Sequence, residues 1–169
     1  GHFHYVVAPG TIFAIFAGIY FWFPKITGKA LNEILGKLNF IFSFIFMNLF
    51  FMPMFLQGFA GLSRRMSDGG VSYAHASGVI HYNEFMMYAS WGLAVAQLPF
   101  ILNIILTLLK KRDENPDPNP WQATTLEWVA APSPPIAHGN FLEVPSVYRG
   151  PYEYSVPGEE NDFSPQNKS

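Results

Sequence analysis

The sequence contains no cysteine, and only 13% of its 169 residues are charged. The absence of cysteine excludes disulfide bonds, thiolate metal sites and a cysteine nucleophile. The formal net charge is -2 and the basic residues form no continuous face, so we expect no nucleic-acid partner. The sequence opens with Gly-His-Phe-His and shows no signal-peptide pattern, and we expect it to be a piece of a longer protein.

Apolar residues are abundant: 50% of the chain is hydrophobic and 17% is aromatic. Three stretches, at about 2–23, 39–60 and 84–109, are each long enough for a membrane-spanning helix, which needs about 20 residues. These runs exceed the usual length of a core helix, which disfavours a soluble protein with three buried helices. The sequence therefore predicts an all-α membrane protein with three transmembrane helices, the first ending at Pro24.

Basic residues near the ends of the spans predict the orientation. The connection after the second span holds only Arg64 and Arg65. The connection after the first span and the segment after the third hold the others: Lys25, Lys29, Lys37, Lys110, Lys111 and Arg112. By the positive-inside rule, the first connection and the tail face the cytoplasm, and the Arg64–Arg65 loop faces outward.

The composition changes after residue 112, because ten of the 14 prolines lie beyond it. We therefore divide the chain into a transmembrane region, 1–112, and an extended, proline-rich cytoplasmic tail, 113–169. Within the tail, the segment Thr124-Thr125-Leu126-Glu127-Trp128 suits a structural role. We expect its Thr and Glu side chains to cap backbone groups and Trp128 to anchor at the membrane interface.

The sharpest local feature is His2-Phe3-His4 at the head of the first span, because ionisable side chains inside a membrane helix are costly. Positions i and i+2 of a helix are about 200° apart, so the two imidazoles point to nearly opposite sides. One shared metal would favour a spacing of i, i+4. The pattern indicates two separate partners, and imidazole is a usual axial ligand of haem iron. The alternative is that each histidine hydrogen-bonds a neighbouring helix.

Arg64 and Arg65 lie at the same membrane face as His2 and His4, because the second span runs antiparallel to the first. Two guanidinium groups just outside two haem-binding imidazoles could hold haem propionates through bidentate hydrogen bonds. The alternatives are two solvated loop arginines, or a pair neutralised by Asp68.

Several motifs together resemble the C-terminal part of subunit I of the haem-copper oxidases, most of all the aa3-type cytochrome c oxidases. They are GHFHYVV, WFP after the first span, GLSRRMSD, and TTLEW followed by PSPP. The resemblance implies that the three spans are the last three helices of a twelve-helix bundle. It also implies an integral protein of the bacterial inner (cell) membrane.

By this resemblance, His2 would ligate the iron of haem a3, His4 would ligate the iron of haem a, and Phe3 would lie between the two haems. Arg64 and Arg65 would match the arginine pair at the haem propionates. The complete subunit would also hold copper B, whose ligands are absent here, so the fragment alone would be inactive.

The resemblance further implies the activity and the partners of the complete protein. The enzyme would reduce oxygen to water with proton translocation, in the respiratory chain. The partners would be the remainder of subunit I, other oxidase subunits, cytochrome c and the lipid bilayer. Two alternatives stay open: a quinol oxidase of the same family, or a haem-free structural membrane subunit.

The remaining polar and sulfur-bearing residues have simpler interpretations. His75, His81 and His138 show no metal-ligand spacing, and we expect them at surfaces. Glu84 is expected to complement the N-terminal dipole of the third helix. Interhelical hydrogen bonds are expected for Asn48, Gln57, Gln97 and Asn103. Packing, rather than copper binding, is expected for Met47, Met52, Met54, Met86 and Met87.

Overall fold

The computed structural model describes residues 1–111, 117–136, 141–153, 155–160 and 162–169. The elements follow in the order α1 (His2–Thr27), α2 (Glu33–Phe59), the 3-10 helix η1 (Ala74–Val79), α3 (Tyr82–Val95), α4 (Leu98–Leu109) and α5 (Leu126–Val129). The described part of the chain contains no β-strand, which confirms the all-α prediction. The expected boundary at residue 112 lies outside the described residues.

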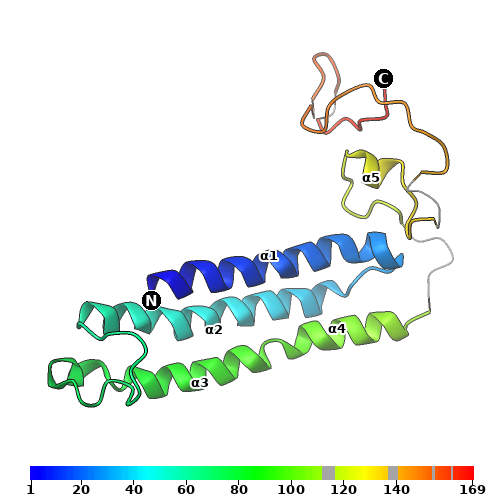
Figure 1. Ribbon diagram of the computed structural model, residues 1–169. Coiled ribbons are helices and arrows are strands. Elements are labelled where there is room, and N and C mark those ends of the chain that lie inside the picture. Colours follow the sequence, from blue (N-terminus) through cyan, green and yellow to red (C-terminus); the bar gives the residue numbers. More distant parts are fainter. Residues whose placement is uncertain (112–116, 137–140, 154, 161) are drawn as a thin grey trace. The chain divides into compact units, whose positions relative to one another are not determined.

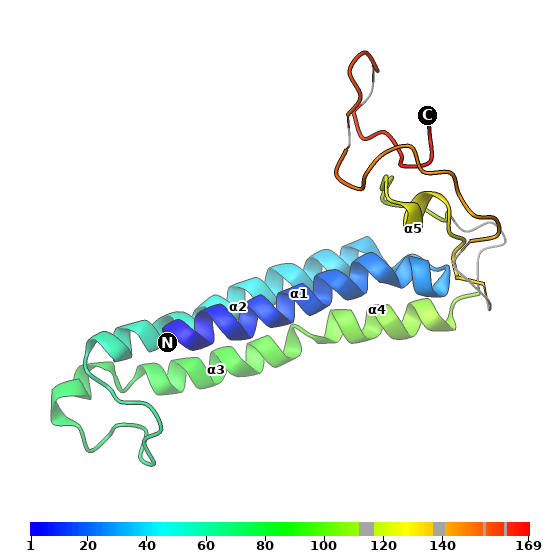
Figure 2. The same ribbon diagram turned by 45° about the horizontal axis from the view of Figure 1, so that its top comes forward.

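Three helical stretches are long and apolar enough to cross a membrane: His2–Thr27, Glu33–Phe59 and Tyr82–Leu109. They confirm the three predicted spans. In Figures 1 and 2, α1, α2 and the α3–α4 segment run side by side along most of their length. The chain forms two compact units. The first comprises Gly1–Gly18 and Asn32–Leu106, and the second comprises Ile19–Leu31 and Thr107–Ser169.

The prediction that Pro24 ends the first span was wrong, because α1 continues to Thr27. Proline removes only one backbone donor, and the carbonyl of Pro24 still accepts a hydrogen bond from Gly28 N at 2.8 Å. The helix ends at Gly28, whose φ of +67° suits a residue without a Cβ.

The second span starts six residues before the expected residue 39, at Glu33. Its start is fixed by Asn32, whose side-chain oxygen accepts a hydrogen bond from Leu35 N at 3.0 Å. An asparagine at this position satisfies one of the free backbone donors of the first turn. The helix then runs without interruption through Pro53 to Phe59.

The third span is not one continuous helix, as the sequence had suggested, but is interrupted at Ala96 and Gln97. The cause is Pro99, which has no N–H to donate to the carbonyl of Val95 and whose ring crowds that carbonyl. Asn39 of α2 donates from Nδ2 to the carbonyl of Ala96 at 3.0 Å. The break therefore lies where another helix supplies a replacement hydrogen bond, as an apolar surrounding requires.

Close packing inside the first unit comes from aromatic side chains and small residues. The ring of Phe46 in α2 lies directly against Gly92 in α3, where an added Cβ would come within 2.2 Å of the ring. Phe13 packs edge-on against Phe40, with ring centroids 5.8 Å apart. A glycine facing an aromatic ring lets two membrane helices approach closely.

The second unit contains the end of α1 and most of the tail. Trp128 of α5 is only 1% exposed and stacks on Trp22 of α1, with centroids 5.5 Å apart. Lys25 is also buried: its Nζ donates to the carbonyl of Ala131 at 2.7 Å and lies 5.1 Å from the centre of the Trp128 ring. Trp128 is thus enclosed by protein, and its anchoring at the membrane interface stays a prediction.

Candidate functional site

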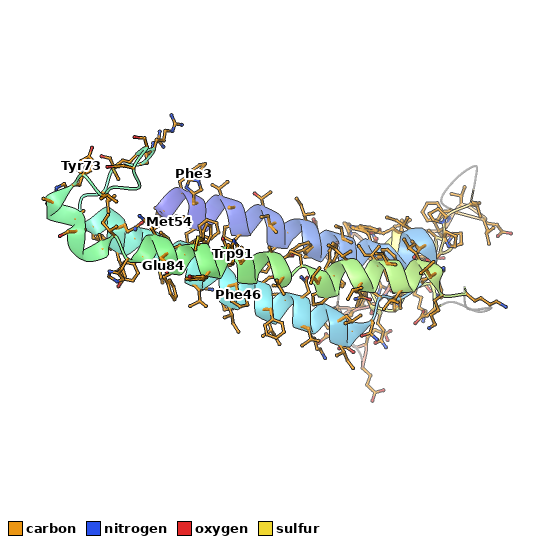
Figure 3. All side chains as sticks on the ribbon, turned by 90° about the horizontal axis from the view of Figure 1, so that it is seen from below. Phe3, Phe46, Met54, Tyr73, Glu84 and Trp91 are labelled. Carbon is orange, nitrogen blue, oxygen red and sulfur yellow. The ribbon has the colours of Figure 1, made fainter. Side chains whose placement is uncertain are left out.

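The head of α1 lies against the last turns of α2. The hydroxyl of Tyr5 donates to Asn48 Oδ1 at 2.5 Å, and its ring packs edge-on against Phe55 at 5.6 Å. Figure 3 shows Phe3 on α1 and Met54 on α2 at the same end of the helices as Tyr73 of the following loop. The antiparallel arrangement therefore brings the HFH motif to the end that also carries the Arg64–Arg65 loop, as the sequence predicted.

The two imidazoles of the HFH motif contact different aromatic side chains of α2. The ring of His2 lies 6.4 Å from that of Phe55, edge to face, and the ring of His4 lies 6.4 Å from that of Phe51, nearly parallel. Phe51 and Phe55 are one helical turn apart. Phe3 packs edge-on against His4 at 5.4 Å, and its side chain is 64% exposed.

The ring nitrogens of both histidines are available to a ligand. His2 and His4 are exposed, and in the described part of the chain neither has a hydrogen-bond partner. The alternative, that each imidazole bonds a neighbouring helix, is therefore not seen within this chain. Imidazole nitrogens without a hydrogen-bond partner among the described residues suit the axial position of a haem iron. In the same described residues, no three His, Cys, Asp or Glu side chains gather as a metal site, so each histidine would act singly.

Arg64 and Arg65 are exposed, and neither forms an ion pair among the described residues. The backbone of Arg65 adopts φ of +62°, a conformation uncommon for a residue with a Cβ.

Asp68 does not neutralise the arginine pair. Its two carboxylate oxygens accept hydrogen bonds from Gly70 N at 3.0 Å and Ser72 N at 2.9 Å. The Ser72 side chain and these backbone donors lower the pKa of Asp68 to about 2. Because the carboxylate is occupied within its own turn, the guanidinium groups remain available to an acidic ligand.

All four amides expected to link helices do so. Asn48 bonds Tyr5 of α1, Gln57 donates to Asn83 Oδ1 of α3 at 2.8 Å, and Gln97 Nε2 donates to Ser43 Oγ of α2 at 3.0 Å. Asn103 of α4 accepts from Asn32 N and donates to its carbonyl, each at 2.8 Å.

Two further amides of equal structural importance, Asn39 and Asn83, were not predicted from the sequence. Asn39 is 1% exposed and bonds across to the break in the third span. Asn83 links α2 to the loop between α2 and α3. Asn39 begins the second predicted span and Asn83 immediately precedes the third, so an amide at the edge of an apolar run was the available signal in both cases.

The remaining histidines behave as surface residues where the structure describes them. His75 and His81 are exposed, while His138 lies outside the described residues. Glu84 lies in the first turn of α3, as expected for a residue that complements the helix dipole, and accepts a hydrogen bond from the Tyr88 hydroxyl at 3.2 Å. Met47 and Met86 are buried, consistent with packing.

The capping role expected for the Thr124–Trp128 segment is filled by another residue. Thr125 occupies the N-cap position of α5 but makes no side-chain cap bond. Gln166 Oε1 accepts from Leu126 N at 3.0 Å instead, and its Nε2 donates to the Arg149 carbonyl at 3.2 Å. The cap is thus supplied from 40 residues away, which local spacing could not predict.

Together, the described residues hold three helical stretches that fit an integral membrane protein, with two exposed histidines at the head of the first. The model of the family described as cytochrome c and quinol oxidase polypeptide I matches residues 1–95. The chain belongs to this family, which confirms the resemblance seen in the motifs.

Individual relatives agree with the family. The chain is 43% identical over 159 residues to cytochrome c oxidase subunit 1 of Synechocystis sp., covering 94% of this chain and 27% of that protein. It is 39% identical over 168 residues to alternative cytochrome c oxidase subunit 1 of Bradyrhizobium diazoefficiens, covering 99% of this chain and 28% of that protein. The chain therefore spans a little over a quarter of the length of these relatives.

Proposed function

We propose that the complete protein to which this chain corresponds is the haem-binding catalytic subunit of a cytochrome c oxidase, reducing oxygen to water with proton translocation. The observation that carries this proposal is the pair of exposed imidazoles of His2 and His4 at the head of a membrane helix, with no hydrogen-bond partner in the part of the chain that the structure describes. Relatives that share up to 43% of the residues are named cytochrome c oxidase subunit 1.

In this proposal His2 ligates the iron of haem a3 and His4 ligates the iron of haem a, with Phe3 between the two groups. When bound, the haem irons supply the electron transfer and the oxygen chemistry. The protein's part is to hold each imidazole at a fixed position. The neighbouring rings, Phe55 beside His2 and Phe51 beside His4, would help to orient the two imidazoles.

Arg64 and Arg65 bind the acidic propionate groups of the haems in this proposal. Support comes from their exposure, the absence of an ion pair among the described residues, and the engagement of Asp68 in its own turn. A planar guanidinium can donate two parallel hydrogen bonds to a carboxylate.

Membership of the family supports the rest of the proposed assembly. Copper B and its ligands would belong to the remainder of subunit I. Cytochrome c is the proposed electron donor, and other oxidase subunits and the lipid bilayer are the remaining partners. We place the protein in the bacterial inner membrane, with the Arg64–Arg65 loop outside and the tail in the cytoplasm, because most lysines near the membrane ends lie on the tail side.

The experiment is a reduced-minus-oxidised absorbance spectrum of the purified complex, with and without carbon monoxide. We expect two a-type haems, of which only one responds to carbon monoxide. A b-type low-spin haem would instead identify the quinol oxidase alternative, which the family description also includes. Absence of any haem would contradict the proposal and favour a structural subunit.

A further inference from the structure

The loop between α2 and α3, residues 60–81, packs around a buried glycine, Gly70. Gly70 has φ of +94°, and a Cβ added there would come within 2.4 Å of Leu62 Cδ2 and 3.1 Å of Met66 Cε. Leu62 and Met66 flank the Arg64–Arg65 pair in the sequence. The side chains on both sides of the arginine pair therefore pack near the same residue.

Two side-chain amides connect the backbone next to Gly70 to α2 and α3. Gln57, in the last turn of α2, donates from Nε2 to Asn83 Oδ1 at 2.8 Å and to the Val79 carbonyl at 3.2 Å. Asn83, in the first turn of α3, donates from Nδ2 to the carbonyl of Gly69 at 2.8 Å. We call Gln57, Asn83 and the Gly69 carbonyl the amide relay. Only one orientation of the Asn83 amide can both accept from Gln57 and donate to Gly69, so the geometry of the relay is fixed.

The amide relay lies where it can fix the conformation of the loop. The two hydrogen bonds that Gln57 donates are part-buried, which limits competition from water, whereas the bond from Asn83 to the Gly69 carbonyl is exposed. Arg64 and Arg65 are exposed as well. Gly69, which accepts the last bond, immediately precedes the buried Gly70. The amide relay thus fixes the backbone next to Gly70, the residue near which Leu62 and Met66 pack.

We propose that Gln57 and Asn83 are positioning residues for Arg64 and Arg65. Gln57, Asn83 and the Gly69 carbonyl tie the ends of α2 and α3 to the loop, and this fixes the place of the two guanidinium groups relative to the head of α1. The proposal rests on the proposed function of the arginine pair at the acidic groups of the haems.

The test uses the complete subunit in the assembled, haem-loaded oxidase. The variants are Gln57→Leu, Asn83→Leu and the double variant, compared with Arg64→Met and Arg65→Met. Ser77→Ala is the matched control, because Ser77 is exposed in η1 of the same loop and makes no bond to the relay. The measurements are haem content, the midpoint potentials of the haems, and backbone hydrogen exchange of residues 61–72.

We expect the relay variants to keep their haem and to shift the midpoint potentials in the same direction as the arginine variants, but less. The double variant should shift them no further than the larger single variant, because both substitutions break one relay. Exchange in the loop should become up to about tenfold faster, as expected for loss of a hydrogen bond. Ser77→Ala should change none of these quantities.

The contrary outcomes separate the two proposals. Unchanged potentials in the relay variants, with shifted potentials in Arg64→Met and Arg65→Met, would overturn the positioning role and leave the arginine function intact. Unchanged loop exchange would overturn it too. Unchanged potentials in the arginine variants would overturn the proposed function of the pair and the positioning role with it.

Discussion

The side-chain amide of Asn39 in α2 donates a hydrogen bond to the backbone carbonyl of Ala96, at 3.0 Å, at the break between α3 and α4. Asn39 is 1% exposed, and Gln97 beside the break bonds Ser43, one turn along α2. A helix interruption inside an apolar layer requires such partners, because water is not available there.

Replacing Asn39 with leucine should therefore destabilise the protein by about 1–2 kcal/mol, because the Ala96 carbonyl would lose its partner in an apolar environment. The measurement is the thermal midpoint of the purified complex in detergent. Ser43→Ala is the control and should cost less, since it leaves the bond from Asn39 to Ala96 in place. Equal losses in the two variants would contradict a special role for the Ala96 bond.

Replacing His4 or His2 should remove different haem signals. His4→Ala should abolish the low-spin haem spectrum and retain a haem that binds carbon monoxide, while His2→Ala should do the reverse. The reason is that the two imidazoles contact different aromatic residues of α2 and would each hold one iron. Equal loss of both signals in both variants would leave the separate assignments without support.

Replacing Arg64 or Arg65 with methionine should change the haem midpoint potentials and the proton stoichiometry more than the haem content. Removing a positive charge near a haem propionate alters the energy of the reduced and oxidised states, while the axial ligands remain. Redox titration and proton-pumping measurements on the assembled oxidase check this. Lys37→Met is a control, because Lys37 pairs with Glu33 on the exposed first turn of α2, far along the helix from its Arg64 end.

The hydrogen bonds that stabilise the turn at Asp68 should persist at moderately acidic pH. Hydrogen bonds from the Ser72 side chain and from the backbone of Gly70 and Ser72 lower its pKa from 3.8 to about 2. Because the folded pKa is below the unfolded one, the stabilisation is fully present above pH 3.8 and is lost as the pH falls toward 2.

Hydrogen exchange of Gly70 and Ser72 measures this effect. After correction for intrinsic exchange rates, the protection of the Gly70 and Ser72 amides from exchange should be constant from neutral pH down to the unperturbed pKa of aspartate. It should decrease below that pH. Asp68→Asn should lose much of this protection at neutral pH, because a neutral amide oxygen is a weaker acceptor than a carboxylate. Protection that decreased near neutral pH would contradict the lowered pKa.

Replacing Gln166 with alanine should loosen the tail around Trp128. Gln166 is buried and caps α5 through Leu126 N, and loss of an N-cap costs about 1 kcal/mol. We expect faster proteolysis of the tail and a red shift of tryptophan emission as Trp128 gains contact with water. The neighbouring variant Asn167→Ala should behave as the parent protein, because the structure gives Asn167 no such bond; matching effects would argue against the cap.

The sequence alone determined the class of the protein. Three apolar runs of sufficient length predict three membrane helices, because each backbone polar group in a bilayer must be bonded within its own helix. The HFH motif and the arginine pair could also be placed at one end of the bundle, since adjacent spans joined by a short connection run antiparallel. These inferences use only length, period and order along the chain.

Only the tertiary structure decided which polar groups meet. The break at Ala96 depends on both Pro99 and Asn39, which lie 60 residues apart, and the cap of α5 comes from Gln166 rather than from the adjacent threonines. The same holds for Gln57 and Asn83, which lie 26 residues apart yet share one hydrogen bond. Each depends on a partner that packing brings close, and packing is a property of the folded chain rather than of any local pattern.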